Sequence, residues 1–178
     1  VRLLEQGGDA AAALPLVSAS ALQSTDVAPY ARYYTGVALQ RLDRLPEAEA
    51  TFARVVAEEK DGYLPIAAAL GVASVRESRG DYAGALAAYE TLAQKKVAAP
   101  QVVWLKLAQM AELAGRQDLA RDTFRFVIDR FPLTQEAVDA ELGLERINGF
   151  DLTAPGMIAK ELVRADALFA ARRNGPAT

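Results

Sequence analysis

Apolar and polar residues alternate along most of the chain with the period of an amphipathic helix. In four places an alanine is followed, four residues later, by a large apolar or aromatic residue on the same helical face. The four pairs are Ala13 and Val17, Ala48 and Phe52, Ala85 and Tyr89, and Ala120 and Phe124. The alanines are 35, 37 and 35 residues apart. The pattern therefore predicts a helical repeat of about 35 residues.

Turn and helix-start signals follow the same period. A short polar or glycine-containing turn precedes each alanine-rich segment, and an apolar-periodic run follows each of Pro29, Pro65, Pro100 and Pro132. Proline fits the first turn of a helix. Each unit is thus predicted to be a helix, a tight turn, a second helix and a proline-marked link. Pro15 lies inside the first expected helix, which should be short or kinked.

This pattern resembles the tetratricopeptide repeat, a helix–turn–helix unit of about 34 residues. The best-matching unit carries, on the family's pattern positions, Trp104, Leu107, Ala108, Gly115, Ala120, Phe124 and Pro132. The unit before it carries Ala73, Gly80, Tyr82, Ala85 and Tyr89, and in the first full unit Asp43 replaces the turn glycine. The resemblance implies an all-α fold, a right-handed α-α superhelix of stacked antiparallel helix pairs.

The chain divides into three expected segments. Residues 1–147 hold the repeats, about three full units after a partial one at the N-terminus. Residues 148–156 are predicted to be a loop because of their Gly, Pro and Asn content. Residues 157–173 are predicted to form a helix that either caps the stack or begins another repeat. Because the chain starts within a unit, we expect it to be a piece of a longer protein.

Composition narrows the range of functions. The 178 residues are 52% apolar and 24% charged, as in globular proteins, and the net charge of −3 argues against a nucleic-acid partner. The absence of cysteine and histidine removes most zinc sites, thiol chemistry and Ser-His catalysis. We therefore expect no cofactor and no metal site. No apolar run approaches the roughly 20 residues of a membrane span.

Two short strings suggest specific chemistry but fit the repeat better. Arg79-Gly80-Asp81 is the tripeptide that integrins read, yet Gly80 falls at the expected turn and Asp81 at a helix start, where aspartate caps free amides. Glu77-Ser78 looks like the acid–serine pair of lytic transglycosylases, which cleave peptidoglycan. The Gly-Leu-Met-Gln and Ala-Tyr-Asn blocks of that family are absent. We expect no catalytic residue in this fragment. Whether the full-length protein is an enzyme stays open.

In tetratricopeptide proteins the first helix of each unit lines a concave groove. The matching positions here are Tyr30, Tyr33, Val37, Gln40, Arg41, Leu70, Ser74, Glu77, Leu105, Gln109 and Glu112. This set does not supply the Lys, Asn and Arg combination with which one subset of the family clamps the C-terminal carboxylates of chaperones. Its mixed lining suits an apolar or amphipathic partner segment, helical or extended. Packing between repeats is the alternative role for the tyrosines, and Tyr34 is expected to face the core.

These features predict a non-catalytic scaffold that binds a protein or peptide partner. Residues 127–147 look like segments of Gram-negative envelope repeat proteins, among them outer-membrane assembly lipoproteins and the periplasmic partner of the Tol-Pal system. Residues 164–173 look like helices of the superhelix that precedes the catalytic domain of soluble lytic transglycosylases, so such a region is the alternative function. Both resemblances imply a periplasmic or cell-envelope location, with the cytoplasm as the other option. Apolar end faces of a truncated solenoid would favour self-association.

Overall fold

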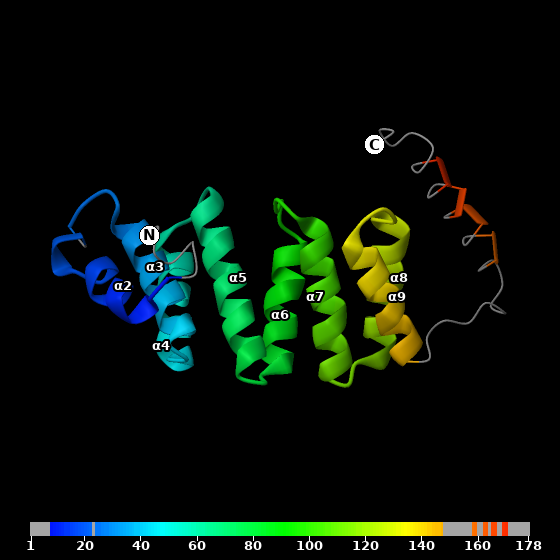
Figure 1. Ribbon diagram of the computed structural model, residues 1–178, viewed down its shortest axis with the longest axis horizontal. Coiled ribbons are helices and arrows are strands. Elements are labelled where there is room, and N and C mark those ends of the chain that lie inside the picture. Colours follow the sequence, from blue (N-terminus) through cyan, green and yellow to red (C-terminus); the bar gives the residue numbers. More distant parts are fainter. Residues whose placement is uncertain are drawn as a thin grey trace. The chain divides into compact units, whose positions relative to one another are not determined.

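The computed structural model describes residues 8–22 and 24–147 and, further along, residues 158–159, 162–163, 165–166 and 169–170. Over these residues the chain is helical and contains no strand. A short 3-10 helix, Ser20–Leu22, follows the first α-helix (Figure 1). The α-helices between residues 8 and 147 are α2 Ala10–Val17, α3 Ala28–Arg41, α4 Leu45–Glu58, α5 Tyr63–Ser78, α6 Tyr82–Ala93, α7 Pro100–Leu113, α8 Gln117–Arg130 and α9 Gln135–Arg146.

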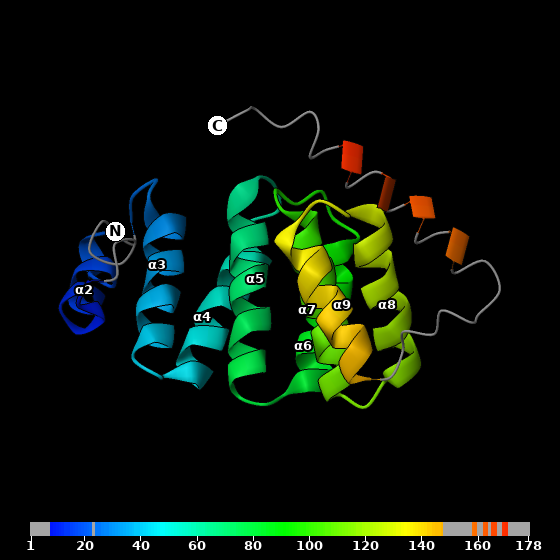
Figure 2. The ribbon, with the colours of Figure 1, turned by 45° about the vertical axis from the view of Figure 1, so that its right-hand side comes forward.

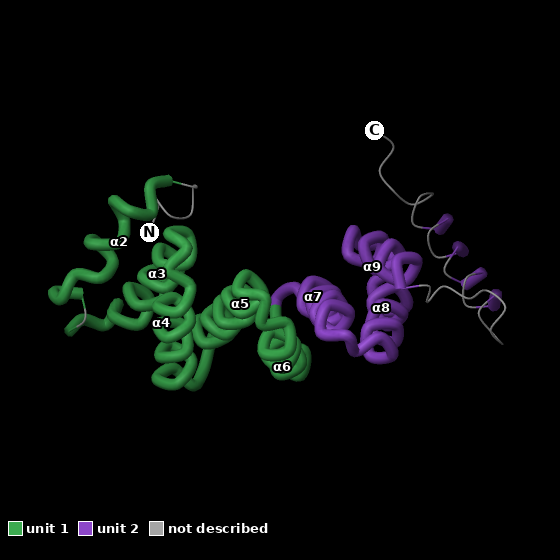
Figure 3. The backbone as a smooth tube through the Cα atoms, turned by 90° about the horizontal axis from the view of Figure 1, so that it is seen from below, with its two compact units in different colours: residues 1–97 green, residues 98–178 purple. Residues whose placement is uncertain are grey.

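The chain forms two compact units, residues 1–97 and residues 98–178 (Figure 3). Unit 1 contains α2 to α6 and unit 2 contains α7 to α9. Consecutive helices within a unit pack against each other, and the first helix of one pair also contacts the first helix of the next, α3 with α5 and α7 with α9 (Figure 2). The expected all-α fold of stacked antiparallel helix pairs is therefore confirmed within each unit.

The predicted alanine and aromatic pairs are buried, and glycines let the neighbouring helices approach the rings. Phe52 on α4 lies between Gly36 on α3 and Gly71 on α5, where an added Cβ would come within 2.8 Å of a ring carbon. Phe124 on α8 contacts Gly143 on α9 in the same way. Each ring thus ties the second helix of a pair to the first helix of the next pair.

Each turn inside the three complete helix pairs contains one residue in the left-handed conformation. Asp43, Gly80 and Gly115 have φ angles of 57°, 74° and 74°. After the first of these, the amide of Arg44 donates to the carbonyl oxygen of Leu39 at 2.9 Å, and equivalent bonds close the other two turns. This hydrogen bond is the 6→1 bond of a Schellman motif. Asp43 therefore occupies the turn-glycine position, as the repeat alignment predicts.

Helix starts also follow the sequence signals. The side chain of Asp81 accepts a hydrogen bond from the Gly84 amide at 3.0 Å, and Asp9 caps α2 in the same manner. Prolines occupy the first turns of α3, α4 and α7. The helix that contains Pro15 has only eight residues, which confirms the expectation of a short helix. Pro132 lies in the link before α9 rather than in the first turn of that helix.

The C-terminal segment is described only in part. The predicted loop 148–156 lies outside the described residues. Within the predicted helix 157–173, the eight described residues are helical. Ile158, Leu162 and Phe169 expose 64%, 62% and 64% of their surface. The role of this helix, as a cap or as part of a further repeat, stays a prediction.

Candidate functional site

The eleven predicted groove residues divide between the two units, eight in unit 1 and three in unit 2. In unit 1 they lie on α3 and α5, which contact each other. The side-chain amide of Gln40 donates to the hydroxyl of Ser74 at 3.0 Å and so joins the two helices. Val37 packs against the buried cluster around Phe52, and Leu70 is half-buried beside this pair of helices. Unit 1 therefore brings these predicted residues to adjoining helices.

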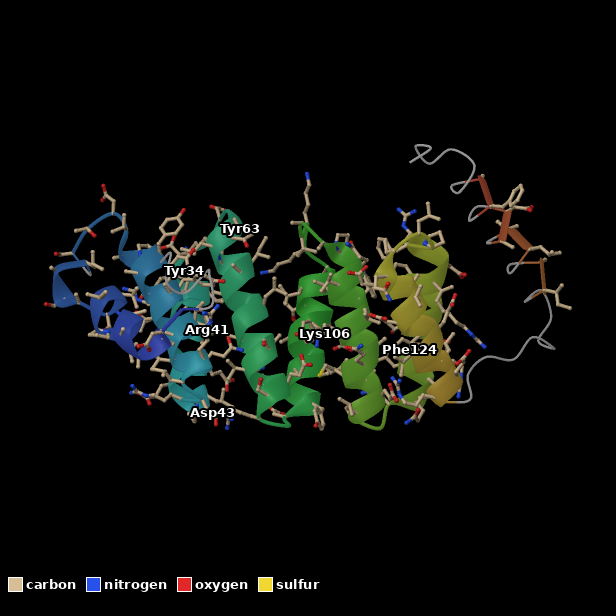
Figure 4. All side chains as sticks on the ribbon, viewed as in Figure 1. Tyr34, Arg41, Asp43, Tyr63, Lys106 and Phe124 are labelled. Atoms are coloured by element: carbon tan, nitrogen blue, oxygen red, sulfur yellow. The ribbon has the colours of Figure 1, made fainter. Side chains whose placement is uncertain are left out.

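Tyrosines gather at the opposite end of α3 and α5 from the Asp43 turn, and Figure 4 shows Tyr34 and Tyr63 there. Tyr30 is 56% exposed and Tyr63 is 72% exposed. Tyr33 is half-buried, and its ring centroid lies 5.7 Å from that of Phe52. Burial, and then the nearby Tyr63, raise the pKa of Tyr33. We call Tyr30, Tyr33 and Tyr63 the tyrosine patch.

Tyr63 is a site residue that the repeat alignment does not single out. It is the first residue of α5 and precedes the apolar run from which groove positions are counted. The available signal is a bulky aromatic residue directly after Gly62, whose φ of 91° marks a turn. Tyr34 packs against the buried cluster that contains Ala13, so the expectation that it faces the core is confirmed.

Glu77, which resembles a catalytic acid in sequence, is held against the next helix. Its carboxylate accepts a hydrogen bond from the Tyr89 hydroxyl at 3.3 Å. Burial raises the pKa of Tyr89 well above its ordinary value, and the negative charge of Glu77 adds to the effect. The hydroxyl of Ser78 donates to the carbonyl oxygen of Ser74 at 3.0 Å. Arg41, the remaining predicted residue of α3, is exposed.

The Arg79-Gly80-Asp81 string has the structural role that the repeat predicts. Gly80 takes the left-handed turn and Asp81 caps α6. The guanidinium of Arg79 pairs with Glu49 on α4 at 2.6 Å. Arg76 also pairs with Glu49, at 2.7 Å, and donates to the carbonyl oxygen of Gly84 at 3.2 Å. These contacts tie the turn to α4, α5 and α6.

In unit 2 the predicted residues lie on α7 and are less accessible. Leu105 is buried with 7% exposure, so little of its side chain reaches the surface. Gln109 is half-buried. Glu112 accepts two hydrogen bonds from Arg146 on α9, both at 2.7 Å. The hydrogen bonds from Arg146 to Glu112 raise the pKa of the Arg146 guanidinium.

The α9 helix contributes surface residues that the sequence reading misses. Arg146 ends α9, and Val138 and Leu142 on the same helix are 46% and 54% exposed. The alignment places residues 134–147 outside the full repeats, so no groove positions were assigned there. A shift of 72 residues would have found them, because it takes Gln40 to Glu112 and Ser74 to Arg146.

The described residues give no candidate for a metal site or for a membrane span. Among them, no three His, Cys, Asp or Glu side chains gather where they could hold a metal ion. Within the same residues, no helix has the length and apolar character needed to cross a membrane.

Comparisons with known proteins agree with the repeat fold. Residues 103–134, which include most of α7 and all of α8, match the tetratricopeptide repeat family model. The fold resembles a solved structure of MamA, residue 41 to the end, from Desulfovibrio magneticus RS-1, with a TM-score of 0.66, 16% identity, and coverage of 99% of this chain and 92% of that one. A second structure, a MamA RS-1 ArsTM double mutant, gives a TM-score of 0.68, 16% identity, and coverage of 95% and 92%. No curated protein has a significantly similar sequence.

The family match, the fold likeness and the phased helix pairs identify the same class of protein. At 16% identity the two MamA structures show the fold alone. The resemblance to the tetratricopeptide repeat found in the sequence is confirmed by the family model for residues 103–134, and the helix pairs along the chain share the fold of the two MamA structures.

Proposed function

We propose that the chain is a non-catalytic scaffold that binds a segment of a partner protein on the α3 and α5 helices of unit 1. The tyrosine patch carries this proposal, because Tyr30 and Tyr63, in the first turns of α3 and α5, are 56% and 72% exposed, and Tyr33 one turn further along α3 is half-buried. Exposed tyrosines combine a large apolar area with a hydrogen-bonding hydroxyl, and they are enriched among the residues that dominate binding energy. Proteins built from such repeats use extended helical surfaces to bind their partners.

The rest of the α3 and α5 surface favours an amphipathic segment. Val37 and Leu70 supply apolar contacts, and the hydrogen-bonded pair of Gln40 and Ser74 supplies polar atoms nearer the turns. An amphipathic helix or an extended strand could present apolar side chains to the first two residues and polar groups to the pair. Unit 2 offers less surface for a partner, because Leu105 is buried and the Glu112 carboxylate is already paired with Arg146.

The experiment replaces the two exposed tyrosines together, as Tyr30→Ala with Tyr63→Ala. Partners are captured from envelope and cytoplasmic extracts, and the best candidate is then purified and titrated against the protein. The double variant should weaken binding by at least about tenfold, because buried aromatic anchors each contribute on the order of 1–2 kcal/mol or more. Tyr82→Ala is the matched control, since Tyr82 begins α6 after the Gly80 turn, at the other end of α5.

A partner that binds the double variant as tightly as the natural chain would disprove the role of this face. Equal losses in the double variant and in Tyr82→Ala would point to general destabilisation instead. Circular dichroism of each variant separates the two cases, because a folded variant retains its helical signal.

The envelope location rests on the sequence resemblance of residues 127–147 to envelope repeat proteins. Fractionation of the source cells followed by immunodetection tests it, and recovery only with cytoplasmic markers would overturn it. The alternative, a superhelical region of a peptidoglycan-cleaving enzyme, rests on residues 164–173. Recovery of the full-length reading frame discriminates between the scaffold and the enzyme, since a downstream catalytic glutamate block would favour the enzyme.

Self-association is tested separately by sedimentation velocity.

A further inference from the structure

Unit 1 contains an apolar hollow among α4, α5 and α6. Its volume is about 230 Å³. An apolar cavity of about 150 Å³ is large enough to bind benzene, so this hollow has room for a somewhat larger aliphatic group. Its α5 residues include Ala69 and Val72, which lie on a different side of that helix from Leu70 and Ser74. The hollow is therefore distinct from the surface proposed above for a partner protein.

Small side chains from three helices create the hollow. Ala53 on α4, Ala69 on α5 and Ala88 on α6 all line it. Unit 2 shows that the repeat does not force this arrangement. The positions 72 residues after Ala53 and Ala69 are occupied by Arg125 and Glu141, and both of these long side chains are half-buried. The hollow thus follows from alanines that are particular to unit 1.

One lining residue differs in chemistry from the others. Lys95 is exposed, and among the described residues it is the one charged side chain that lines the hollow. None of the ion pairs found among the described residues involves Lys95. The hydroxyl of Thr91 is occupied by the carbonyl oxygen of Ala87 at 3.0 Å. The lining therefore combines an apolar wall with a single available cation, as small-ligand pockets with one orienting group do.

We propose that this hollow binds a medium-length aliphatic carboxylate of about eight carbons. The hydrocarbon chain lies against Val56 and Val72, which are both half-buried, and the carboxylate pairs with the ammonium group of Lys95. The apolar wall selects the chain, and the positive charge selects an acid over an alcohol or an amine of the same length. The site is independent of the tyrosine patch, so either can exist without the other.

Isothermal titration calorimetry with octanoate tests the proposal on the whole chain. Octanoate should bind at one saturable site, and hexanoate should bind about fifteenfold more weakly, because it lacks two methylenes and each buried methylene contributes roughly a fourfold gain in affinity. Octan-1-ol and octylamine should bind more weakly than octanoate. An absence of saturable octanoate binding overturns the proposal, and equal binding of the acid and the alcohol overturns the role of the cation.

Three variants locate the site. Ala69→Leu fills the hollow and should abolish octanoate binding, and Ala53→Arg with Ala69→Glu, which installs the residues of unit 2, should do the same. Lys95→Gln should weaken binding by about fivefold, as expected for one exposed ion pair. Lys96→Gln is the matched control and should leave affinity unchanged, since Lys96 does not line the hollow. Undiminished binding by both filled variants, with their helical circular dichroism intact, would place the octanoate elsewhere and overturn the assignment.

Discussion

The α3–α5 segment of unit 1 and the α7–α9 segment of unit 2 share one packing scheme with different surfaces. A shift of 72 residues relates Phe52 to Phe124 and Gly71 to Gly143, and each aromatic ring contacts the glycine of its own unit. The same shift relates the turn residues Asp43 and Gly115. The ring, the glycine that faces it on the next helix and the turn position are therefore kept in both units, whereas unit 2 has Ala108 where Gly36 faces Phe52 in unit 1.

At other positions the same shift of 72 residues relates side chains of different chemical character. The neutral hydrogen bond from Gln40 to Ser74 corresponds to the ion pair of Glu112 with Arg146. Where Arg32 and Arg54 both pair with Glu58 in unit 1, unit 2 has Trp104 and Phe126 with ring centroids 4.4 Å apart. Helix packing thus constrains the buried ring and glycine positions, while the faces between helices are free to carry charge or aromatic surface.

The largest effect is expected from removing the buried aromatic ring of each unit. Phe52→Ala and Phe124→Ala should each lower the free energy of unfolding by about 3–5 kcal/mol, because both rings are at most 1% exposed. Urea unfolding can report each unit separately. The single tryptophan, Trp104, lies in unit 2, and all six tyrosines lie in unit 1. Identical transitions of both signals in both variants would show that the two units unfold as one.

The next effect tests the glycine that faces each ring. Gly71→Ala and Gly143→Ala should each destabilise by about 1–3 kcal/mol, because the new methyl group would overlap a buried ring. Denaturant midpoints give the measurement. Replacing Phe124 by Leu in the Gly143→Ala background should restore part of the loss. A neutral Gly→Ala exchange in either unit would mean that the ring shifts freely.

Tyr89 occupies the position of Phe52 and Phe124 in the remaining full pair, but it carries a hydroxyl. Its pKa is raised in the folded state, so its contribution to stability is complete below the ordinary pKa of about 10 and is lost as the pH rises above it. Above that pH the free energy of unfolding should fall by up to about 1.4 kcal/mol per pH unit for this residue. Tyr89→Phe should remove this part of the slope in pH-dependent unfolding, and an unchanged slope would contradict the assignment.

A smaller effect is expected from substitutions at two of the three left-handed turns. Asp43→Gly should stabilise unit 1 by about 0.5–1 kcal/mol, because glycine adopts a φ of 57° without steric strain. Gly115→Ala should destabilise unit 2 by about 1 kcal/mol for the opposite reason. Thermal unfolding followed by circular dichroism measures both. A loss of stability in Asp43→Gly would show that the aspartate makes a favourable contact at this turn.

The smallest effect is expected from replacing the ion pair of unit 2 with the neutral hydrogen-bonded pair of unit 1. Glu112→Gln with Arg146→Ser gives unit 2 the neutral pair of unit 1 and should change stability by less than about 1 kcal/mol, since an ion pair whose arginine is 56% exposed contributes little. The salt dependence of unfolding should decrease in this variant. A much larger loss would show that the bidentate pair, with Glu112 only 15% exposed, determines how α7 and α9 pack.

The sequence was most informative where one residue type meets one physical requirement. The alanine and aromatic pairs, the left-handed turn residues and the capping aspartates all fall where they were predicted, because each depends on local geometry or on the repeat period. The surface residues that meet across helices were harder to predict. Tyr63 and Arg146 were missed because their roles depend on the neighbouring helix, and Leu105 matched a groove position while being buried.

By itself the sequence determined the repeat, the helix pairs and the structural role of Arg79-Gly80-Asp81. These follow from spacing, since a helix repeats every 3.6 residues and a left-handed turn favours glycine. Only the tertiary structure decided which side chains meet across helices. It brought Tyr63 near enough to Tyr33 to help raise the pKa of Tyr33, joined Glu112 to Arg146 and left the hollow beside Ala69. Such contacts depend on side-chain volume and helix approach, which the order of residues along one helix does not specify.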